Sequence, residues 1–381
     1  MKILKYLYRL LIFPIIALLN RSTNAYVKIP DPNLATVVRK ALRLEANARI
    51  PLKRFQALNH LDGNNSEICD LTGLEKAVGL IELDIYANQI ENLTPLTGLT
   101  QLRDLELSAN NITDITPLAG LMQLKHLSLN YNQISDLTPL TELKQLKDLG
   151  LGKNQISDIT PLAELTQITK LGLWGNPLSD ITPLVGLTQM RSLNIRQNQI
   201  SDITPLSELT RITNLWLWDN QISDITPLTK LTQLRYLWLS GNQIRDITPL
   251  AELKLLRTLD LSKNQISDIT PLTQLTQVDQ LGLGGNQISD ITTIAGLTQM
   301  KGLGLWKNQV SDITSLSELT LLTELSLAQN QIQDISLVEN FRGLTSLSVD
   351  DNLIQDTAPL LRLLKRLPDL ELDIELPPAD N

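Results

Sequence analysis

The sequence predicts an α/β solenoid. Copies of one short unit stack into a curved horseshoe, with a parallel β-sheet on the concave face, short 3₁₀ or helical turns on the convex face and a helical N-terminal cap. Two observations predict this. An asparagine-marked pattern returns every 22 residues, in about thirteen copies from residue 80 to 365. Within each copy leucines alternate with polar residues, the period of a half-buried strand. A unit this short cannot bury its apolar side alone, so the copies must pack against one another.

Residues 1–25 have the pattern of a signal peptide. Basic residues precede an apolar run from Leu10 to Leu19, and a small-residue cleavage pattern ends at Ala25. The alternative is an uncleaved anchor, but a bilayer span needs roughly 20 apolar residues. This run is about half that length and is interrupted by Pro14. We therefore expect cleavage and export, with no stable membrane insertion afterwards.

Residues 26–62 follow as the helical N-terminal cap, because an open solenoid needs a cover at each raw end. Asp31–Leu42 has the apolar spacing of a helix behind a capping residue, and Pro51–Leu58 predicts a second, shorter helix. Residues 63–365 are the repeat solenoid. We expect one elongated domain because each copy contacts only its neighbours.

Residues 366–381 are predicted to be a C-terminal cap and tail. A final helix is expected over Pro359–Leu367. The alternation over Leu370–Leu376 then predicts one or two closing strand turns.

One copy shows how each coil is expected to form. Leu105 and Leu107 should face the core, while the polar residues between and beside them face out. The asparagine of each copy follows the strand, where its amide can satisfy backbone groups of two coils. Thr116-Pro117 predicts a helix cap followed by proline at the first helical position. The recurring aspartate, such as Asp114, is expected to cap this turn rather than to form a ladder of cation sites.

These units match the pattern L-x-x-L-x-L-x-x-N-x-L, and their Ser-Asp-Ile-Thr-Pro-Leu tails resemble the internalin-type leucine-rich repeats of bacterial surface proteins. The stretch from Ile29-Pro30-Asp31 to Leu61-Asp62 is similar to the helical N-terminal cap of that family. The resemblance implies a leucine-rich-repeat horseshoe that recognises proteins on or outside a bacterial cell. It does not identify the partner.

Charge and cysteine content narrow the function classes. The formal net charge is −8, and loss of residues 1–25 removes four basic and no acidic residues, which leaves −12. An acidic protein is a poor match for nucleic acid or anionic lipid and favours basic or neutral partners. Cys69 is the only cysteine. An exported chain of this kind has no intramolecular disulfide framework, and we expect a surface or half-buried thiol.

The residues that vary between copies on the concave columns are the informative ones. All five tryptophans fall there, and by register Trp216 and Trp238 are neighbours in one column. Exposed aromatic residues near an arginine have the composition of interface hot spots, although cross-strand stacking alone could also explain them. The candidate ligand-binding residues are Trp174, Arg196, Trp216, Trp218, Tyr236, Trp238 and Trp306.

Glycines lie on both sides of these aromatic residues. They either flatten the sheet so that it admits a bulky ligand or are neutral variation. They are Gly150, Gly152, Gly172, Gly282, Gly284, Gly302 and Gly304.

The N-terminal third of the same face is acidic. Carboxylates on adjacent strands lie within a few ångströms by strand spacing, which could bind calcium. A solvated face that attracts a basic partner is the preferred interpretation, and no metal or cofactor is expected. This acidic patch consists of Glu82, Asp84, Asp104, Glu106 and Asp148.

A hydrolytic triad of Ser128, His126 and either Asp104 or Asp148 lacks its usual context. The serine and histidine are two apart on one strand, without a pocket, a nucleophile turn or an oxyanion hole. We therefore expect no enzyme.

The sequence thus predicts an exported, non-catalytic scaffold that binds a protein through its concave face and is secreted, periplasmic or attached to a bacterial surface. Two alternatives remain open. One is a carbohydrate or cell-wall binder that uses the same aromatic residues, and the other is an intracellular scaffold resembling the phosphatase-regulating subfamily of 22-residue repeats.

Overall fold

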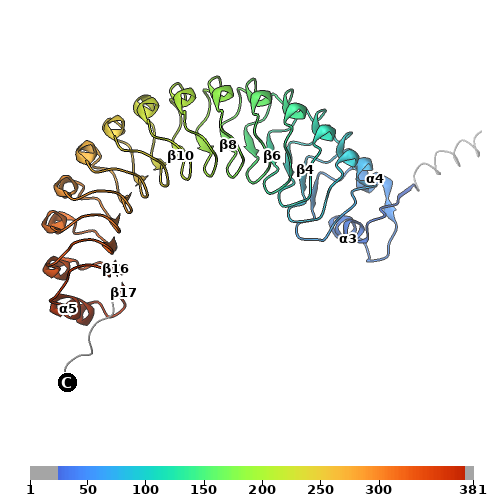
Figure 1. Ribbon diagram of the computed structural model, residues 1–381. Helices are drawn as coiled ribbons and strands as arrows, with labels where there is room; N and C mark the ends of the chain where they lie inside the picture. Colours follow the sequence, from blue (N-terminus) through green and yellow to red (C-terminus); the bar gives the residue numbers. More distant parts are fainter. Residues whose placement is uncertain (1–24, 374–381) are drawn as a thin grey trace, which may run out of the picture. The chain divides into compact units, whose positions relative to one another are not determined.

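The computed structural model describes residues 25–373. The chain divides into two compact units between Ile168 and Thr169. In each unit the strands line one side and the 3₁₀ turns the other (Figure 1). The expected signal peptide, except for Ala25, lies outside the described residues.

Each coil contributes one short parallel strand. Neighbouring strands pair in a register of one repeat, so that Leu215 lies opposite Leu237 and Trp216 opposite Trp238. The first unit contains β3 (His60–Asp62), β4 (Glu82–Asp84), β5 (Asp104–Glu106), β6 (His126–Ser128) and β7 (Asp148–Gly150). The second contains β8 (Lys170–Gly172), β9 (Ser192–Asn194), β10 (Asn214–Trp216), β11 (Tyr236–Trp238), β12 (Thr258–Asp260), β13 (Gln280–Gly282), β14 (Gly302–Gly304), β15 (Glu324–Ser326), β16 (Ser346–Ser348) and β17 (Glu371–Asp373).

Opposite the strands, each coil forms a short 3₁₀ turn. In the first unit these are η2 (Leu74–Lys76), η3 (Thr94–Leu96), η4 (Thr116–Leu118), η5 (Thr138–Leu140) and η6 (Thr160–Leu162). In the second they are η7 (Thr182–Leu184), η8 (Thr204–Leu206), η9 (Thr226–Lys230), η10 (Thr248–Leu250), η11 (Thr270–Gln274), η12 (Thr292–Gly296), η13 (Thr314–Glu318) and η14 (Ser336–Asn340). The predicted fold class, a parallel-sheet solenoid with 3₁₀ turns, is confirmed.

The core lies between strands and turns and is built from repeated aliphatic positions. Leu105 and Leu107 are fully or almost fully buried, as the alternation predicts. Ser108 differs from the expectation. It lies beyond the strand but is only 4% exposed, because its hydroxyl pairs with that of Ser128 at 2.7 Å and accepts a hydrogen bond from the backbone N–H of Asn130.

The asparagine of each copy joins two coils, as predicted. The Asn220 side-chain amide donates to the carbonyls of Ile195 and Leu217, both at 3.0 Å, and its oxygen accepts from the N–H of Ile200 at 3.1 Å. Asn220 is only 8% exposed. Repeated along the chain, these hydrogen bonds form an asparagine ladder that ties each strand end to its neighbour. A buried backbone group without a partner costs about 1–3 kcal/mol, so each asparagine stabilises two coils.

The residue just before each of these asparagines has a left-handed backbone. Ala109 has φ 56° and Gln197 has φ 54°, and three copies place glycine at this position. Left-handed geometry costs an ordinary residue about 1–2 kcal/mol, so the surrounding hydrogen bonds must hold it in place.

The turn on the opposite side is capped by the aspartate and not by the threonine. Asp114 accepts a hydrogen bond from the backbone N–H of Thr116 at 2.8 Å, while Thr116 is the first residue of η4 and Pro117 the second. The predicted threonine cap was therefore wrong, and the predicted aspartate cap is confirmed. Hydrogen bonds from the Thr116 side chain and backbone lower the pKa of Asp114.

A small N-terminal subdomain covers the first coil. It contains β1 (Tyr26–Val27), α3 (Pro32–Ala41), β2 (Ile50–Pro51) and α4 (Leu52–Gln56), and β1 pairs with β2 in antiparallel fashion. The two predicted helices are thus present, each slightly shorter than expected.

Asp31 caps α3 and at the same time joins this subdomain to the first coil. One carboxylate oxygen accepts from the N–H groups of Asn33 and Leu34, and the other accepts from those of Cys69 and Asp70. Burial alone would raise the pKa of Asp31, but these hydrogen bonds outweigh burial and lower it. The Cys69 thiol is exposed, within the expected range.

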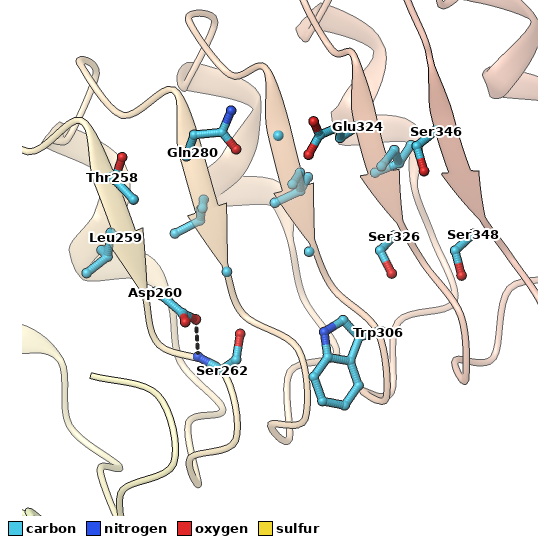
Figure 2. Close-up of a pocket in the computed structure, with 16 residues that line it drawn as sticks. Thr258, Leu259, Asp260, Ser262, Gln280, Trp306, Glu324, Ser326, Ser346 and Ser348 are labelled. Atoms are coloured by element: carbon cyan, nitrogen blue, oxygen red, sulfur yellow. Dashed lines mark hydrogen bonds between the residues drawn. The ribbon is translucent and has the colours of Figure 1, made fainter. Parts of the chain in front are cut away.

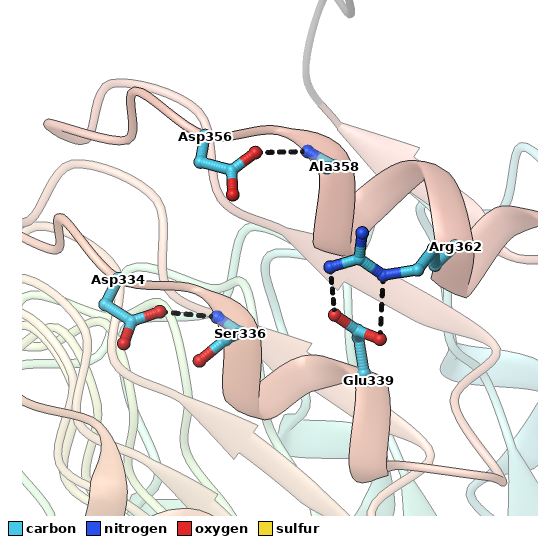
Figure 3. Close-up of polar contacts among 6 residues, drawn as sticks. All are labelled: Asp334, Ser336, Glu339, Asp356, Ala358 and Arg362. Carbon is cyan, nitrogen blue, oxygen red and sulfur yellow. Dashed lines mark hydrogen bonds and ion pairs between the residues drawn. The ribbon is translucent and has the colours of Figure 1, made fainter.

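The C-terminal end is closed by α5 (Ala358–Arg366) and β17. Figure 3 shows Arg362 of α5 holding Glu339 of η14 in a two-pronged ion pair, with N–O distances of 3.0 and 2.7 Å. Asp356 accepts from the N–H of Ala358 and caps the helix. The predicted helix and first closing strand are present, and residues 374–381 lie outside the described part.

Candidate recognition surface

The strands present three columns of side chains on one face. They come from the first and third residues of each strand and from the residue two positions beyond it. Register pairing places equivalent residues of adjacent coils side by side, as with Trp216, Trp238 and Asp260 in the middle column of the second unit. A continuous surface can therefore be assembled from residues 22 positions apart.

Trp216 and Trp238 form a flat aromatic platform. Their ring centroids are 4.8 Å apart and their planes differ by 5°. Tyr236 extends the platform, with its ring 6.2 Å from that of Trp238 and an interplanar angle of 13°. All three side chains are partly exposed, so the platform keeps one face towards solvent.

Arg196 stands between two indole rings in the adjacent column. Its guanidinium carbon is 4.6 Å from the centroid of Trp174 and 4.9 Å from that of Trp218. Cation–π contacts of this kind are worth about 0.5–2 kcal/mol each, so they hold the charge in a fixed position. The Nε atom is buried without a hydrogen-bond partner. Within residues 25–373 no carboxylate forms an ion pair with this arginine.

The sequence-predicted aromatic residues are thus brought together in two neighbouring groups. We call Trp174, Arg196, Trp216, Trp218, Tyr236 and Trp238 the aromatic patch. Trp306 lies farther along the second unit and lines a recess of about 410 Å³ together with Trp218 and Trp238. Its indole covers Gly284, where an added Cβ would lie 2.1 Å from Nε1.

Around Trp306 the strand face of the second unit is hollowed. The glycine hollow, about 480 Å³ in volume, extends over strands β12–β16, and Figure 2 shows side chains standing around a bare centre. Gly282, Gly284, Gly302 and Gly304 all belong to it or to its wall. The sequence signal for it was the local run of glycines, while its acidic residues Asp260 and Glu324 were not recognised.

In the first unit, the expected acidic residues line one hollow of about 450 Å³. Sequence reasoning missed His60, which precedes the clear repeats but pairs with Glu82 at 3.0 Å. His126 lies 3.8 Å from Asp104 on the neighbouring strand. Among residues 25–373 no group of three or more histidine, cysteine or acidic residues is placed to hold a metal ion.

Ser128 is not set up as a nucleophile. Its hydroxyl bonds to Ser108 and accepts from the Asn130 side-chain amide at 2.9 Å. General-base activation requires a hydrogen bond between the serine hydroxyl and the histidine. In the described part of the chain no hydrogen bond joins Ser128 to His126. Ser128 and His126 therefore do not form a nucleophile–base pair in this structure.

None of the helices among residues 25–373 is both long enough and apolar enough to cross a membrane.

Comparison with known proteins agrees with this architecture. A family model described as leucine-rich repeats in two copies matches residues 78–120, 123–164, 166–208, 210–252 and 254–296, and a single-repeat model matches 318–338. No curated protein sequence matches the chain.

Solved structures give strong matches. An internalin, InlF, from Listeria monocytogenes is 33% identical, with a TM-score of 0.77 over 92% of this chain and 96% of that one. The functional domain of InlJ from the same organism is 26% identical, with a TM-score of 0.74 over 90% of this chain and 78% of that one. A plant peptide hormone receptor, RGFR1, solved in complex with RGF2, has the same fold, with 19% identity and a TM-score of 0.65 over 80% of this chain and 61% of that one.

The family models cover more than half of the chain, and InlF exceeds 30% identity over nearly all of it. The chain belongs to the leucine-rich-repeat proteins of the internalin type.

Proposed function

We propose that this protein is an exported, non-catalytic recognition scaffold that binds a protein partner through the aromatic patch. The observation that carries the proposal is the arrangement around Arg196. Trp174 and Trp218 cover both faces of the guanidinium, and no carboxylate of the described chain neutralises it. The positive charge therefore has no partner within residues 25–373, and a binding partner can supply an acceptor for the exposed part of the guanidinium.

The terminal Nη groups are the accessible part of Arg196. Of its nitrogen atoms only Nε is buried without a partner, and the two indoles cover the flat faces of the guanidinium. An approaching oxygen must therefore meet the outer edge of the guanidinium. That edge has the fork geometry that suits a carboxylate, so we expect an acidic side chain of the partner to bind there.

The platform of Trp216 and Trp238 supplies the apolar part of the same contact. Tryptophan and arginine are enriched among the residues that dominate interface energies. The two indoles form a flat, partly exposed surface beside the fixed charge of Arg196. We therefore expect the partner to place an apolar residue on the indoles and an adjacent acidic residue at the arginine.

The test separates affinity from stability. Trp216→Ala and Trp238→Ala should each weaken binding by about 2 kcal/mol or more, roughly 30-fold. Their melting temperatures should change little, because neither ring lies in the leucine core. Gln309→Ala, on an exposed turn outside the patch, serves as the control. Capture from envelope extracts, with a glycan panel in parallel, measures binding.

The outcomes are distinct. Capture of a protein by the wild type and the control, but not by the tryptophan variants, supports the proposal. Binding of sugars alone would support the carbohydrate alternative. Variants that melt several degrees lower yet capture the same ligand equally well would show that the rings only stabilise the sheet.

A further inference from the structure

The glycine hollow has a built interior rather than a merely flat floor. Three of its side chains lean over glycines of adjacent coils. An added Cβ would lie 2.5 Å from Asp260 at Gly282 and 2.0 Å from Gln280 at Gly302, and Trp306 covers Gly284 in the same way. The glycines therefore leave room for a carboxylate, an amide and an indole to lie over the coils of β13 and β14.

Gly304 forms the uncovered floor. A Cβ added there meets nothing nearer than 3.9 Å, so no neighbouring side chain occupies that space. Figure 2 shows Asp260 and Glu324 on opposite sides of this bare region, with Trp306 below it. The open volume thus lies between two acidic residues with an indole at its edge.

The charge of the hollow has one sign. Asp260 and Glu324 are the charged residues that line it, and no lysine or arginine does so. Asp260 accepts a hydrogen bond from the N–H of Ser262 at 3.0 Å, which leaves its second oxygen available. Lys263 lies near Trp306 but lines the neighbouring recess instead. An indole face and carboxylates are the groups that bind an ammonium or guanidinium.

From these observations we infer that the glycine hollow binds an extended, basic peptide segment of the partner, with two lysine or arginine side chains four residues apart. Asp260 ends β12 and Glu324 begins β15, so they are about 14 Å apart across three strands and about 7 Å apart along them, or about 16 Å in all. An extended chain rises about 3.4 Å per residue, so positions i and i+4 are about 14 Å apart, which is closer to this span than i+2 or i+6. Those positions point to the same side.

This geometry assigns a role to each part of the hollow. The basic residue at position i forms an ion pair with Asp260, and Trp306 lies beside its aliphatic chain. The basic residue at i+4 forms an ion pair with Glu324. The side chain at i+2 then lies over Gly304, where the missing side chain leaves room for it. The inference rests on the proposal that the strand face binds protein, but it does not require the aromatic patch.

Synthetic peptides test it directly with the full mature chain. One fluorescent peptide carries lysines at i and i+4, leucine at i+2 and serines elsewhere. A second of the same composition places the lysines at i and i+3, which lie on opposite sides of an extended chain. We expect the first to bind at least about fivefold more tightly by anisotropy, and its binding to weaken at high salt.

Substitutions locate the site. Gly304→Leu should weaken binding about tenfold or more by filling the floor. Gly296→Leu is the matched control, because Gly296 lies on the outer turn η12 with nothing within 4 Å of an added Cβ. Glu324→Gln should weaken binding about threefold, the scale of an exposed ion pair, while Glu318→Gln on η13 should not. Trp174→Ala, which disrupts the aromatic patch, should leave peptide binding unchanged.

Three results would overturn the inference. Equal binding of the two lysine arrangements would show that the spacing of the charges is not recognised. Undiminished binding of the peptide by Gly304→Leu would place the peptide elsewhere. Binding of chito-oligosaccharides, run as a separate probe, that Gly304→Leu abolishes while the peptide does not bind would make the hollow a sugar site. If Trp174→Ala captures the envelope partner as well as the wild type does, that result contradicts the role proposed for the aromatic patch and not this inference.

Discussion

The asparagine ladder shows how one residue type can serve two coils. Its amide has two donors and one acceptor within a single short side chain, and the turn after each strand leaves carbonyl and N–H groups within reach. Asn110 donates to the carbonyls of Ile85 and Leu107 and accepts from the N–H of Ile90. A hydroxyl or an aliphatic side chain cannot provide all three hydrogen bonds.

Asn220→Ala should lower the free energy of unfolding by about 1–3 kcal/mol, because three buried backbone groups lose their partners. Asn352→Ala should cost less. Asn352 makes equivalent hydrogen bonds but is more exposed, so water can replace the amide. Denaturant unfolding followed by circular dichroism measures both, with the exposed Asn111→Ala as control. Equal losses for Asn220 and Asn352 would contradict this account of the ladder.

At this scale the sequence predicted residue roles where the contact is local or repeats. The asparagine and aspartate were identified because both act within their own or the adjacent coil. The contacts of Asp31 with Cys69 and Asp70 were not predicted, since they join segments 38 and 39 residues apart and occur once. The enclosure of Arg196 depends on side-chain conformations, which register alone does not determine.

The turn that begins each 3₁₀ segment is the recurring element on the outer side. In coil after coil an aspartate accepts the N–H two residues ahead, as Asp202 does from Thr204 and Asp224 from Thr226, both at 2.8 Å. Hydrogen bonds from those threonine side chains and backbones lower the pKa of both carboxyls, while neighbouring aspartates partly oppose the shift. The ionised form is therefore the one that the fold favours.

The melting temperature should accordingly fall in acid. A lowered folded pKa means that the carboxylates stabilise the fold above their unfolded pKa, near 3.8, and lose that effect as pH falls through the lower folded value. We expect a nearly constant contribution from these turns between about pH 7 and 5 and a decline below about pH 4. Thermal melts across this range measure it.

A triple variant isolates the turns. Asp202→Asn, Asp224→Asn and Asp246→Asn keep an oxygen acceptor but do not titrate, so the acid decline should become shallower. The corresponding alanine variant removes the caps and should melt lower at neutral pH as well. An unchanged acid decline in the asparagine variant would show that other carboxylates govern it.

The left-handed backbone of the residue before each ladder asparagine could not be predicted from the sequence. Glycine marks such positions most clearly, but only Gly175, Gly241 and Gly285 occupy this one among the ladder copies. Elsewhere alanine, tyrosine, lysine, glutamine or aspartate adopts the same backbone. The stacked coils impose the conformation, so no single copy displays it in its own residue preferences.

At the scale of the whole molecule, charge and N-terminal sequence bear on where the protein acts. The formal charge of −8 becomes −12 if residues 1–25 are removed, which favours the basic segment inferred for the glycine hollow. The stacking itself was predictable because a regular period leaves few alternatives. The distribution of charged and aromatic surfaces along it was predictable only as columns, not as contacts.

Export should leave a mature protein that begins at Tyr26. Mass spectrometry of protein from the culture medium or periplasm measures this, and a chain with its N-terminus shortened by 25 residues is the expected result. An intact Met1 in a cytosolic fraction would contradict export and favour the intracellular scaffold. A variant with Ala25 replaced by a bulky residue is the control, since it should slow cleavage without altering the repeats.

The one-repeat register of strands, ladder and turns has a genetic consequence. Each coil offers the next the same interface, as the repeated pairing of Leu215 with Leu237 and Leu237 with Leu259 illustrates. A crossover between misaligned copies in the gene therefore inserts or deletes a whole coil and rejoins surfaces that already fit. Such crossovers can lengthen the strand face, or change the spacing between the aromatic patch and the glycine hollow, while the packing of the core stays the same.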